Sequence, residues 1–230
     1  MEKTQKKTTV ISAIAVFFII ALFCRYLTNE TELLTNIDNS FIRTILQGIG
    51  PAIGAFIAAK IFHIQPIMSL KGNFVNIFIP LSIYWLLTAV LIGTTAYFTK
   101  GTFPIAAIFT ILIYGLLEEI GWRGFLQHLL SPLPKFIGIL LITVLWFIWH
   151  LNFELSTSNI AFFFILLLGS WGIGLVAEKT NSLLAVAAFH SLNNFFAGLN
   201  LQKAILLAVL SIIWILSIIC RHKLEKPISS

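Results

Sequence analysis

Charged residues are scarce in this sequence, at 10% of 230 residues. A soluble domain carries roughly 25%, so this chain cannot cover a folded core with a surface that water solvates. This excludes an ordinary soluble enzyme and a disordered chain. The formal net charge of +6 does not indicate a nucleic-acid binder, because the basic residues lie between apolar runs and form no patch.

Cysteine is also scarce, with Cys24 in the first apolar run and Cys220 at the end of the last. In the topology argued below, the two lie near opposite membrane faces, roughly 30 Å apart. That separation is far beyond disulfide reach. We therefore expect two apolar filler residues and no disulfide between them.

Long apolar runs are abundant, and hydrophobic residues make up 58% of the chain. The first run follows a basic start, but it is too long for a signal-peptide core and no small-residue cleavage pattern follows it. Each run approaches the ~20 residues that a helix needs to cross ~30 Å of hydrocarbon. The sequence predicts an all-α, polytopic membrane protein of about eight transmembrane helices, with the active site in the helix bundle. The runs are at about 10–27, 43–62, 75–98, 103–129, 136–152, 160–177, 182–199 and 203–220.

The distribution of Lys and Arg predicts the orientation of these spans. With both termini in the cytoplasm, ten basic residues fall on the inner side and four on the outer side, with Arg123 set aside. We therefore expect a multi-pass protein, in a bacterial cytoplasmic membrane, with both termini cytoplasmic. No soluble appendage is visible, so residues 1–230 are expected to form a single transmembrane domain. Its parts are N-terminal spans at 1–100, a catalytic core at 103–200, and a last span with a basic tail at 203–230.

Charged side chains inside apolar runs cost roughly 2.5–3.5 kcal/mol each on insertion scales, which makes them functional candidates. Glu118, Glu119 and Arg123 lie near the end of one such run. Residues four apart share a helix face, so Glu119 and Arg123 are natural partners in a bidentate ion pair.

Glu118 points elsewhere and has no partner in its own helix. An unpaired carboxylate in apolar surroundings holds a proton more readily than one in water, which suits a general base. We assign Glu118 to chemistry and the other two to support, with a neutral clamp between helices as the alternative.

Two histidines also lie within apolar runs. His190 and Asn194 are four apart and share a helix face, and Asn193 is close enough in angle to remain a candidate. An imidazole and a carboxamide side by side can donate hydrogen bonds to an oxyanion, or they can bond across helices as structural contacts. His150 follows Trp146, Phe147 and Trp149, and the alternative for it is an aromatic belt at the membrane interface.

A simple estimate places Glu118 and His150 at different depths. At 1.5 Å per residue, each lies about 22 Å from the start of its own run. In straight antiparallel spans they would lie roughly 8 and 20 Å from the inner face. Either the helix after Pro132 and Pro134 begins deep in the membrane, or the helix before them is offset or tilted.

Together, the three motifs resemble the CPBP family of intramembrane glutamic endopeptidases, which includes the type II CAAX prenyl proteases and bacteriocin-processing or immunity-type proteins. The motifs are Glu-Glu-x-x-x-Arg, an aromatic residue four before His, and His-x-x-x-Asn, in family order within about residues 103–200. In one respect the sequence departs from the family, because Trp146 stands where Phe is usual.

The resemblance implies a role for each residue. Glu118 would activate a water that His150 helps to hold, and His190 with Asn194 would form the oxyanion hole. Glu119 and Arg123 would be the supporting pair. Two histidines and glutamates raise the question of zinc, but HExxH is absent and Asn is a weak zinc ligand. We therefore expect no metal and no cofactor.

The expected function is hydrolysis of a peptide bond in a membrane-associated peptide or a lipidated protein tail. The expected partners are that substrate and membrane lipid, and no nucleic acid. One alternative is a non-catalytic membrane immunity protein that binds a partner without cutting it. A proton-coupled transporter is a third possibility, because intramembrane Glu and His can relay protons. However, the sequence shows no matching pair of Gly/Pro-broken segments.

Overall fold

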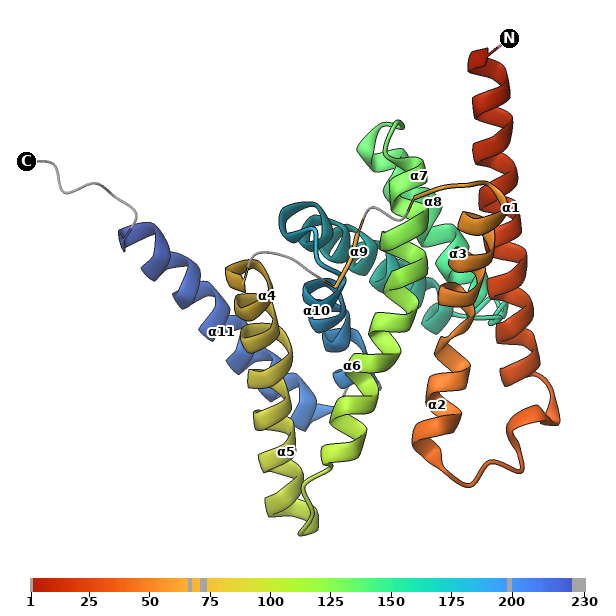
Figure 1. Cartoon of the computed structure of the whole chain (residues 1–230). Helices are drawn as coiled ribbons and strands as arrows, with labels where there is room; N and C mark the ends of the chain where they lie inside the picture. Colours follow the sequence, from red (N-terminus) through yellow and green to blue (C-terminus); the bar gives the residue numbers. More distant parts are fainter. Residues whose placement is uncertain (1, 66–67, 71–73, 198–199, 225–230) are drawn as a thin grey trace, which may run out of the picture.

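The computed structural model describes residues 2–65, 68–70, 74–197 and 200–224 (Figure 1). Within these ranges every regular element is a helix, and the one sheet-like contact is an isolated parallel bridge between Ser69 and Ser182. The prediction of an all-α fold is therefore confirmed. The elements are α1 (Glu2–Asn29), η1 (Glu32–Leu34), α2 (Ser40–Gly48), α3 (Gly50–Ile61), α4 (Phe74–Pro80), η2 (Leu81–Leu86), α5 (Leu87–Lys100), α6 (Ile105–Glu119), η3 (Ile120–Gln127), α7 (His128–Leu130), α8 (Lys135–Trp149), α9 (Thr157–Thr180), α10 (Leu183–Phe195) and α11 (Leu201–Leu224).

The chain is an integral membrane protein, but the count of eight spans is not confirmed. In the described part of the chain, four helices are long and apolar enough to cross a bilayer: Thr8–Asn29, Phe74–Lys100, Ile105–Leu130 and Thr157–Thr180. The pair α2 and α3, bent by 41°, makes a fifth if it is one span. Each remaining predicted run does contain a helix. However, α8 and α10 have 15 and 13 residues, about 22 and 20 Å, which is shorter than the hydrocarbon layer.

Two of the long helices contain π-helical turns. In the second span, Pro80 ends α4 and the π-helical turn η2 follows at once. Proline lacks the N–H that an α-helix requires, and the wider π turn accommodates that missing bond. The same span ends at Gly101, whose positive φ of 72° closes the helix, with its N–H donating to the carbonyl of Tyr97.

The helix α6 lies inside the bundle and packs against α2, α3 and α10 (Figure 1). A glycine allows one of these close approaches, because a side chain at Gly48 of α2 would lie 2.6 Å from the Tyr114 ring of α6. Between α6 and α10, Gly115 faces the His190 ring, where a side chain would be at an ordinary contact distance of 3.4 Å.

The first helix, α1, packs mainly on α3, and its end reaches α8, where the indole N–H of Trp149 donates to the carbonyl of Ala21 at 3.1 Å. Cys24 lies on the same part of α1, is partly buried and forms no disulfide among the described residues. The side chain of Cys220 lies outside the described residues. The prediction that the two cysteines are far apart therefore stays a prediction.

The turn between α7 and α8 relates the position of Glu118 to positions on α8. Glu118 lies 12 residues before Leu130, where α7 ends, and Trp146 lies 11 residues after Lys135, where α8 begins. At about 1.5 Å per residue, these two residues lie roughly 17 Å from the turn, and His150 lies about 6 Å farther along than Trp146. The continuous helix Ile105–Leu130 has 26 residues, about 39 Å. It is longer than roughly 30 Å of hydrocarbon, so the straight, full-length span that the depth estimate assumes does not describe it.

Candidate active site

Glu118, Glu119 and Arg123 lie where α6 passes into the π-helical segment η3. Their relative exposures are 2%, 0% and 1%. The transition is visible in the backbone, where the N–H of Ile120 donates to the carbonyls of both Leu116 and Glu118. A π turn is a local distortion that often marks a functional site. Here it follows directly after the two adjacent carboxylates.

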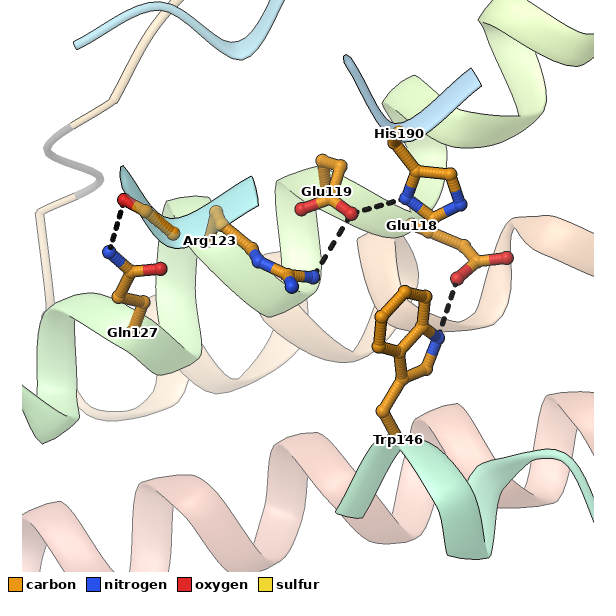
Figure 2. A network of polar contacts seen from close by, with 7 residues as sticks. Glu118, Glu119, Arg123, Gln127, Trp146 and His190 are labelled. Atoms are coloured by element: carbon orange, nitrogen blue, oxygen red, sulfur yellow. Dashed lines mark hydrogen bonds and ion pairs between the residues drawn. The ribbon is translucent and has the colours of Figure 1, made fainter. Parts of the chain in front are cut away.

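The Glu119 carboxylate is the centre of one half of the polar network (Figure 2). Nη1 of Arg123 donates to Oε1 of Glu119 at 3.0 Å, which confirms the predicted i,i+4 pair. The pair is held by one bond instead of the expected two, and Nδ1 of His190 contacts the same oxygen. The other oxygen, Oε2, and the Nε and Nη2 groups of Arg123 have no hydrogen-bond partner among the described residues. Glu119 is therefore held between two basic side chains from α10 and η3.

The Glu118 carboxylate lies in the other half of the network. Its Oε2 accepts a hydrogen bond of 2.9 Å from the indole N–H of Trp146, on α8 (Figure 2). Within the described part of the chain, Glu118 takes part in no ion pair. The same indole ring also contacts the other half, because the Arg123 guanidinium carbon lies 5.0 Å from its centroid and the His190 ring 5.4 Å.

His150 caps the C-terminus of α8, and its Nδ1 lies 2.7 Å from the backbone carbonyl of Trp146. Its ring packs edge-on against Trp149 at 5.2 Å and Phe162 at 4.8 Å. The Glu118 carboxylate is close enough to act on the ring electrostatically. His150 therefore lies against the polar network, on the side of Glu118.

His190 and Asn194 lie on the α10 face that packs on α6, but they have different partners. His190 is 2% exposed and contacts Glu119. The side-chain nitrogen of Asn194 is buried, has no hydrogen-bond partner among the described residues and borders a cavity of about 270 Å³. Asn193 lies elsewhere, because its amide nitrogen comes within 3.1 Å of the position that a side chain on Gly169 of α9 would take. The two asparagines therefore have different neighbours, and Asn194 is the one that borders this cavity.

Two residues that the sequence analysis did not single out also belong to this site. Tyr114 lies one helical turn before Glu118, and its hydroxyl interacts with both the Glu118 carboxylate and the Arg25 guanidinium. Arg25 lies in α1, far from the three motifs in sequence, and it borders the same cavity as Asn194. The i,i+4 spacing of Tyr114 and Glu118 could have indicated the first of these contacts. No sequence pattern connects Arg25 to the site.

The described residues contain no group of three His, Cys, Asp or Glu side chains arranged to hold a metal ion. Glu119 and His190 form an ion pair, and the same Glu119 oxygen also accepts from Arg123. The polar groups of the site form donor and acceptor pairs. The Glu118 carboxylate accepts from the neutral Trp146 indole, and the Glu119 carboxylate lies between two basic side chains.

The family comparison agrees with the resemblance expected from the three motifs. Residues 99–196 match the family model described as type II CAAX prenyl endopeptidase Rce1-like. No curated protein matches the chain. The matched segment contains all six candidate residues, namely Glu118, Glu119, Arg123, His150, His190 and Asn194. Over residues 99–196, the chain is therefore similar to the type II CAAX prenyl endopeptidases.

Proposed function

We propose that the protein is an intramembrane endopeptidase in which Glu118 is the general base and no metal takes part. The observation that carries this proposal is the contrast between two adjacent carboxylates. Glu119 is held by Arg123 and His190, whereas Glu118 takes part in no ion pair among the described residues and accepts from the neutral indole of Trp146. A carboxylate that is not committed to a cation can take a proton from water and return it later.

His150 supplies a second contact for the attacking water. Its Nδ1 faces the carbonyl oxygen of Trp146 and therefore carries the hydrogen that donates to it. In this tautomer Nε2 keeps its lone pair and can accept a hydrogen bond from the water. Glu118 and His150 together would orient the water oxygen toward the substrate carbonyl, and this orientation is a large part of catalysis in a bimolecular reaction.

His190 and Asn194 supply the donors for the oxyanion. Since Nδ1 of His190 is engaged by Glu119, Nε2 is the ring nitrogen left for a substrate, and it donates when the ring is protonated. Glu119 would thus fix the orientation of His190, as a carboxylate commonly does for a catalytic histidine. The side-chain N–H groups of Asn194 are without a protein partner and are available as the second donor.

The reaction then proceeds in two steps. The water oxygen bonds to the scissile carbonyl carbon while Glu118 takes the proton, and the carbonyl oxygen becomes an oxyanion that His190 and Asn194 stabilise. Glu118 next delivers the proton to the amide nitrogen, the C–N bond breaks and the oxyanion returns to a carbonyl. The products are a new carboxyl terminus and a new amine, and the base regains its starting state.

The proposed substrate is a membrane-associated peptide or a lipidated protein tail, consistent with the endopeptidase family that residues 99–196 match. The catalytic core would be about residues 103–200. We further propose a bacterial cytoplasmic membrane with both termini cytoplasmic, as the excess of basic residues on that side favours.

The test uses the full chain in lipid nanodiscs and a panel of quenched peptides that includes prenylated tails and leader peptides, with and without a chelator. Glu118→Gln should lower kcat by about 10³-fold without changing thermal unfolding. Glu154→Gln, at an exposed glutamate after α8, is the matched control and should retain full activity. Cleavage that survives in Glu118→Gln, or stops with the chelator, would refute the proposal. Retention of the cellular phenotype in Glu118→Gln would favour the alternative of a non-catalytic immunity protein.

A further inference from the structure

Arg25 lies near the end of α1, outside the segment that matches the family model. Its Nη1 donates to the backbone carbonyl of Gln47 at 3.2 Å. Its guanidinium carbon lies 4.4 Å from the centroid of the Trp149 ring. With the Asn29 amide oriented to fit its neighbours, the amide oxygen accepts from Nε and Nη2 of Arg25 at 3.2 Å. Four separate contacts therefore fix the guanidinium beside α8, one residue from His150.

The partners of Arg25 are all neutral. No carboxylate of the described residues lies within 4.0 Å of it, whereas Arg123 has Glu119 at 3.0 Å. Arg25 is partly buried, and a cation that is partly removed from water is stabilised by an opposite charge beside it. The structure thus holds one arginine whose charge is balanced inside the site and another whose charge is left unbalanced.

The cavity beside Arg25 has the size and the polar groups of a small subsite. It measures about 270 Å³ and is bordered by Arg25, Gln47, Tyr114 and Asn194, among others. Sites that enclose a drug-sized ligand measure roughly 300–1,000 Å³, so this cavity has room for the end of a peptide and not for a longer stretch. Through Tyr114 it is connected to Glu118.

We propose that Arg25 binds the C-terminal carboxylate of the peptide substrate and so sets which peptide bond reaches Glu118. This inference rests on the proposed function. A guanidinium binds a carboxylate through paired N–H groups, and that carboxylate would supply the missing counter-charge. The neutral contacts to Gln47 and Asn29 hold the guanidinium at the cavity, while the unpartnered amide of Asn194 lies on the same cavity wall.

A binding measurement tests this assignment without relying on turnover. The probe is a labelled peptide of six apolar residues, made with a free C-terminal acid and as its C-terminal amide. The protein is the full chain in nanodiscs with Glu118→Gln, so that neither peptide is cut. The acid should bind about 10- to 100-fold more tightly than the amide. Adding Arg25→Gln should reduce this ratio to below twofold, and Arg25→Lys should retain part of it.

Arg43→Gln is the matched control. Like Arg25, Arg43 donates to a backbone carbonyl, in this case that of Ile37, but it does not border the cavity. It should leave the ratio of acid to amide unchanged. In the active protein, Arg25→Gln should raise KM for the acid peptide with little change in kcat, which a general loss of folding would not do.

The possible failures can be told apart. Three results would overturn the role of Arg25. They are equal binding of the acid and the amide, no binding of either peptide, and a preference for the acid that survives Arg25→Gln. If equal binding is found but the peptides are still cleaved in a Glu118-dependent way, the proposed function stands. An acid preference that depends on Arg25, without cleavage of any peptide, would support the subsite and count against the protease assignment.

Discussion

The two halves of the polar network contain the same chemical group in opposite surroundings. Around Glu119, the basic groups of Arg123 and His190 balance the carboxylate, and all three side chains are closed off from solvent. Around Glu118, the nearest donors are neutral, and Tyr114 connects it to a cavity that Arg25 borders. The Glu119 carboxylate is engaged by two basic groups, while the Glu118 carboxylate takes part in no ion pair among the described residues. Adjacent positions in one helix can therefore differ completely in their electrostatic surroundings.

The largest expected effect is a difference in kcat between variants of Glu118 and variants of Glu119. Glu118→Gln keeps the side chain's shape but removes the base, and kcat should fall by about 10³-fold with unchanged thermal unfolding. Glu119→Gln should lower kcat less, since His190 can still be placed by packing. Steady-state kinetics of both variants in nanodiscs measures the difference. If Glu119→Gln proves the more damaging to kcat while remaining fully folded, the assignment of the two glutamates is reversed.

The second-largest expected effect distinguishes Glu119 from Glu118 by the stability of the folded protein. Glu119→Gln leaves Arg123 buried without its counter-charge, and loss of one partner of a buried pair costs roughly 3–5 kcal/mol. The double variant Glu119→Gln/Arg123→Met removes both charges and should regain much of that loss. Chemical unfolding in mixed micelles measures the free energy of unfolding. Equal stability of Glu119→Gln and wild type would show that the pair contributes nothing to the folded state.

A smaller effect tests the hydrogen bond to Glu118. Trp146→Phe keeps an aromatic ring, in fact the residue usual in the family, but removes the indole N–H that donates at 2.9 Å. A hydrogen bond to a charged group contributes about 1.5–3 kcal/mol, so kcat should change by at least about tenfold. Trp122→Phe is the matched control, because the buried Trp122 N–H has no partner among the described residues. Identical kinetics for the two variants would mean that the indole N–H does not influence the base.

The smallest effect concerns an ion pair outside the network. Lys135 at the start of α8 and Glu178 in α9 lie 2.6 Å apart, with side chains 50% and 47% exposed. Exposed pairs contribute only about 0–1 kcal/mol, so Lys135→Gln should change the free energy of unfolding by less than 1 kcal/mol. Activity should not change. A loss comparable to that of Glu119→Gln would mean that burial does not distinguish the two ion pairs.

Contacts within one helix were predictable from the sequence. The i,i+4 spacing predicted the pair of Glu119 with Arg123, and the structure confirms it. The same reasoning separated Glu118 from that pair. Periodicity succeeds here because helix geometry fixes which side chains share a face, whatever the rest of the fold.

Contacts between helices were not predictable from spacing. Neither the bond from Trp146 to Glu118 nor the contact of His190 with Glu119 follows from one helix alone. The depth estimate assumed straight, full-length spans, whereas the helix that contains Glu118 has 26 residues and α8 has only 15. Arg25 was treated only as an outer basic residue, since its place beside Trp149 depends on how α1 packs on α8.

The short length of α8 has a consequence for the lipid around the protein. This helix presents Phe136, Leu141 and Val144 on the surface and has only 15 residues, about 22 Å against roughly 30 Å of hydrocarbon. A bilayer adapts to a short hydrophobic element by becoming thinner next to it. Lipid headgroups and water would therefore approach the end of α8, where His150 lies. Bilayer thickness thus becomes a variable in hydrolysis, and turnover should depend on the acyl-chain length of the surrounding lipid.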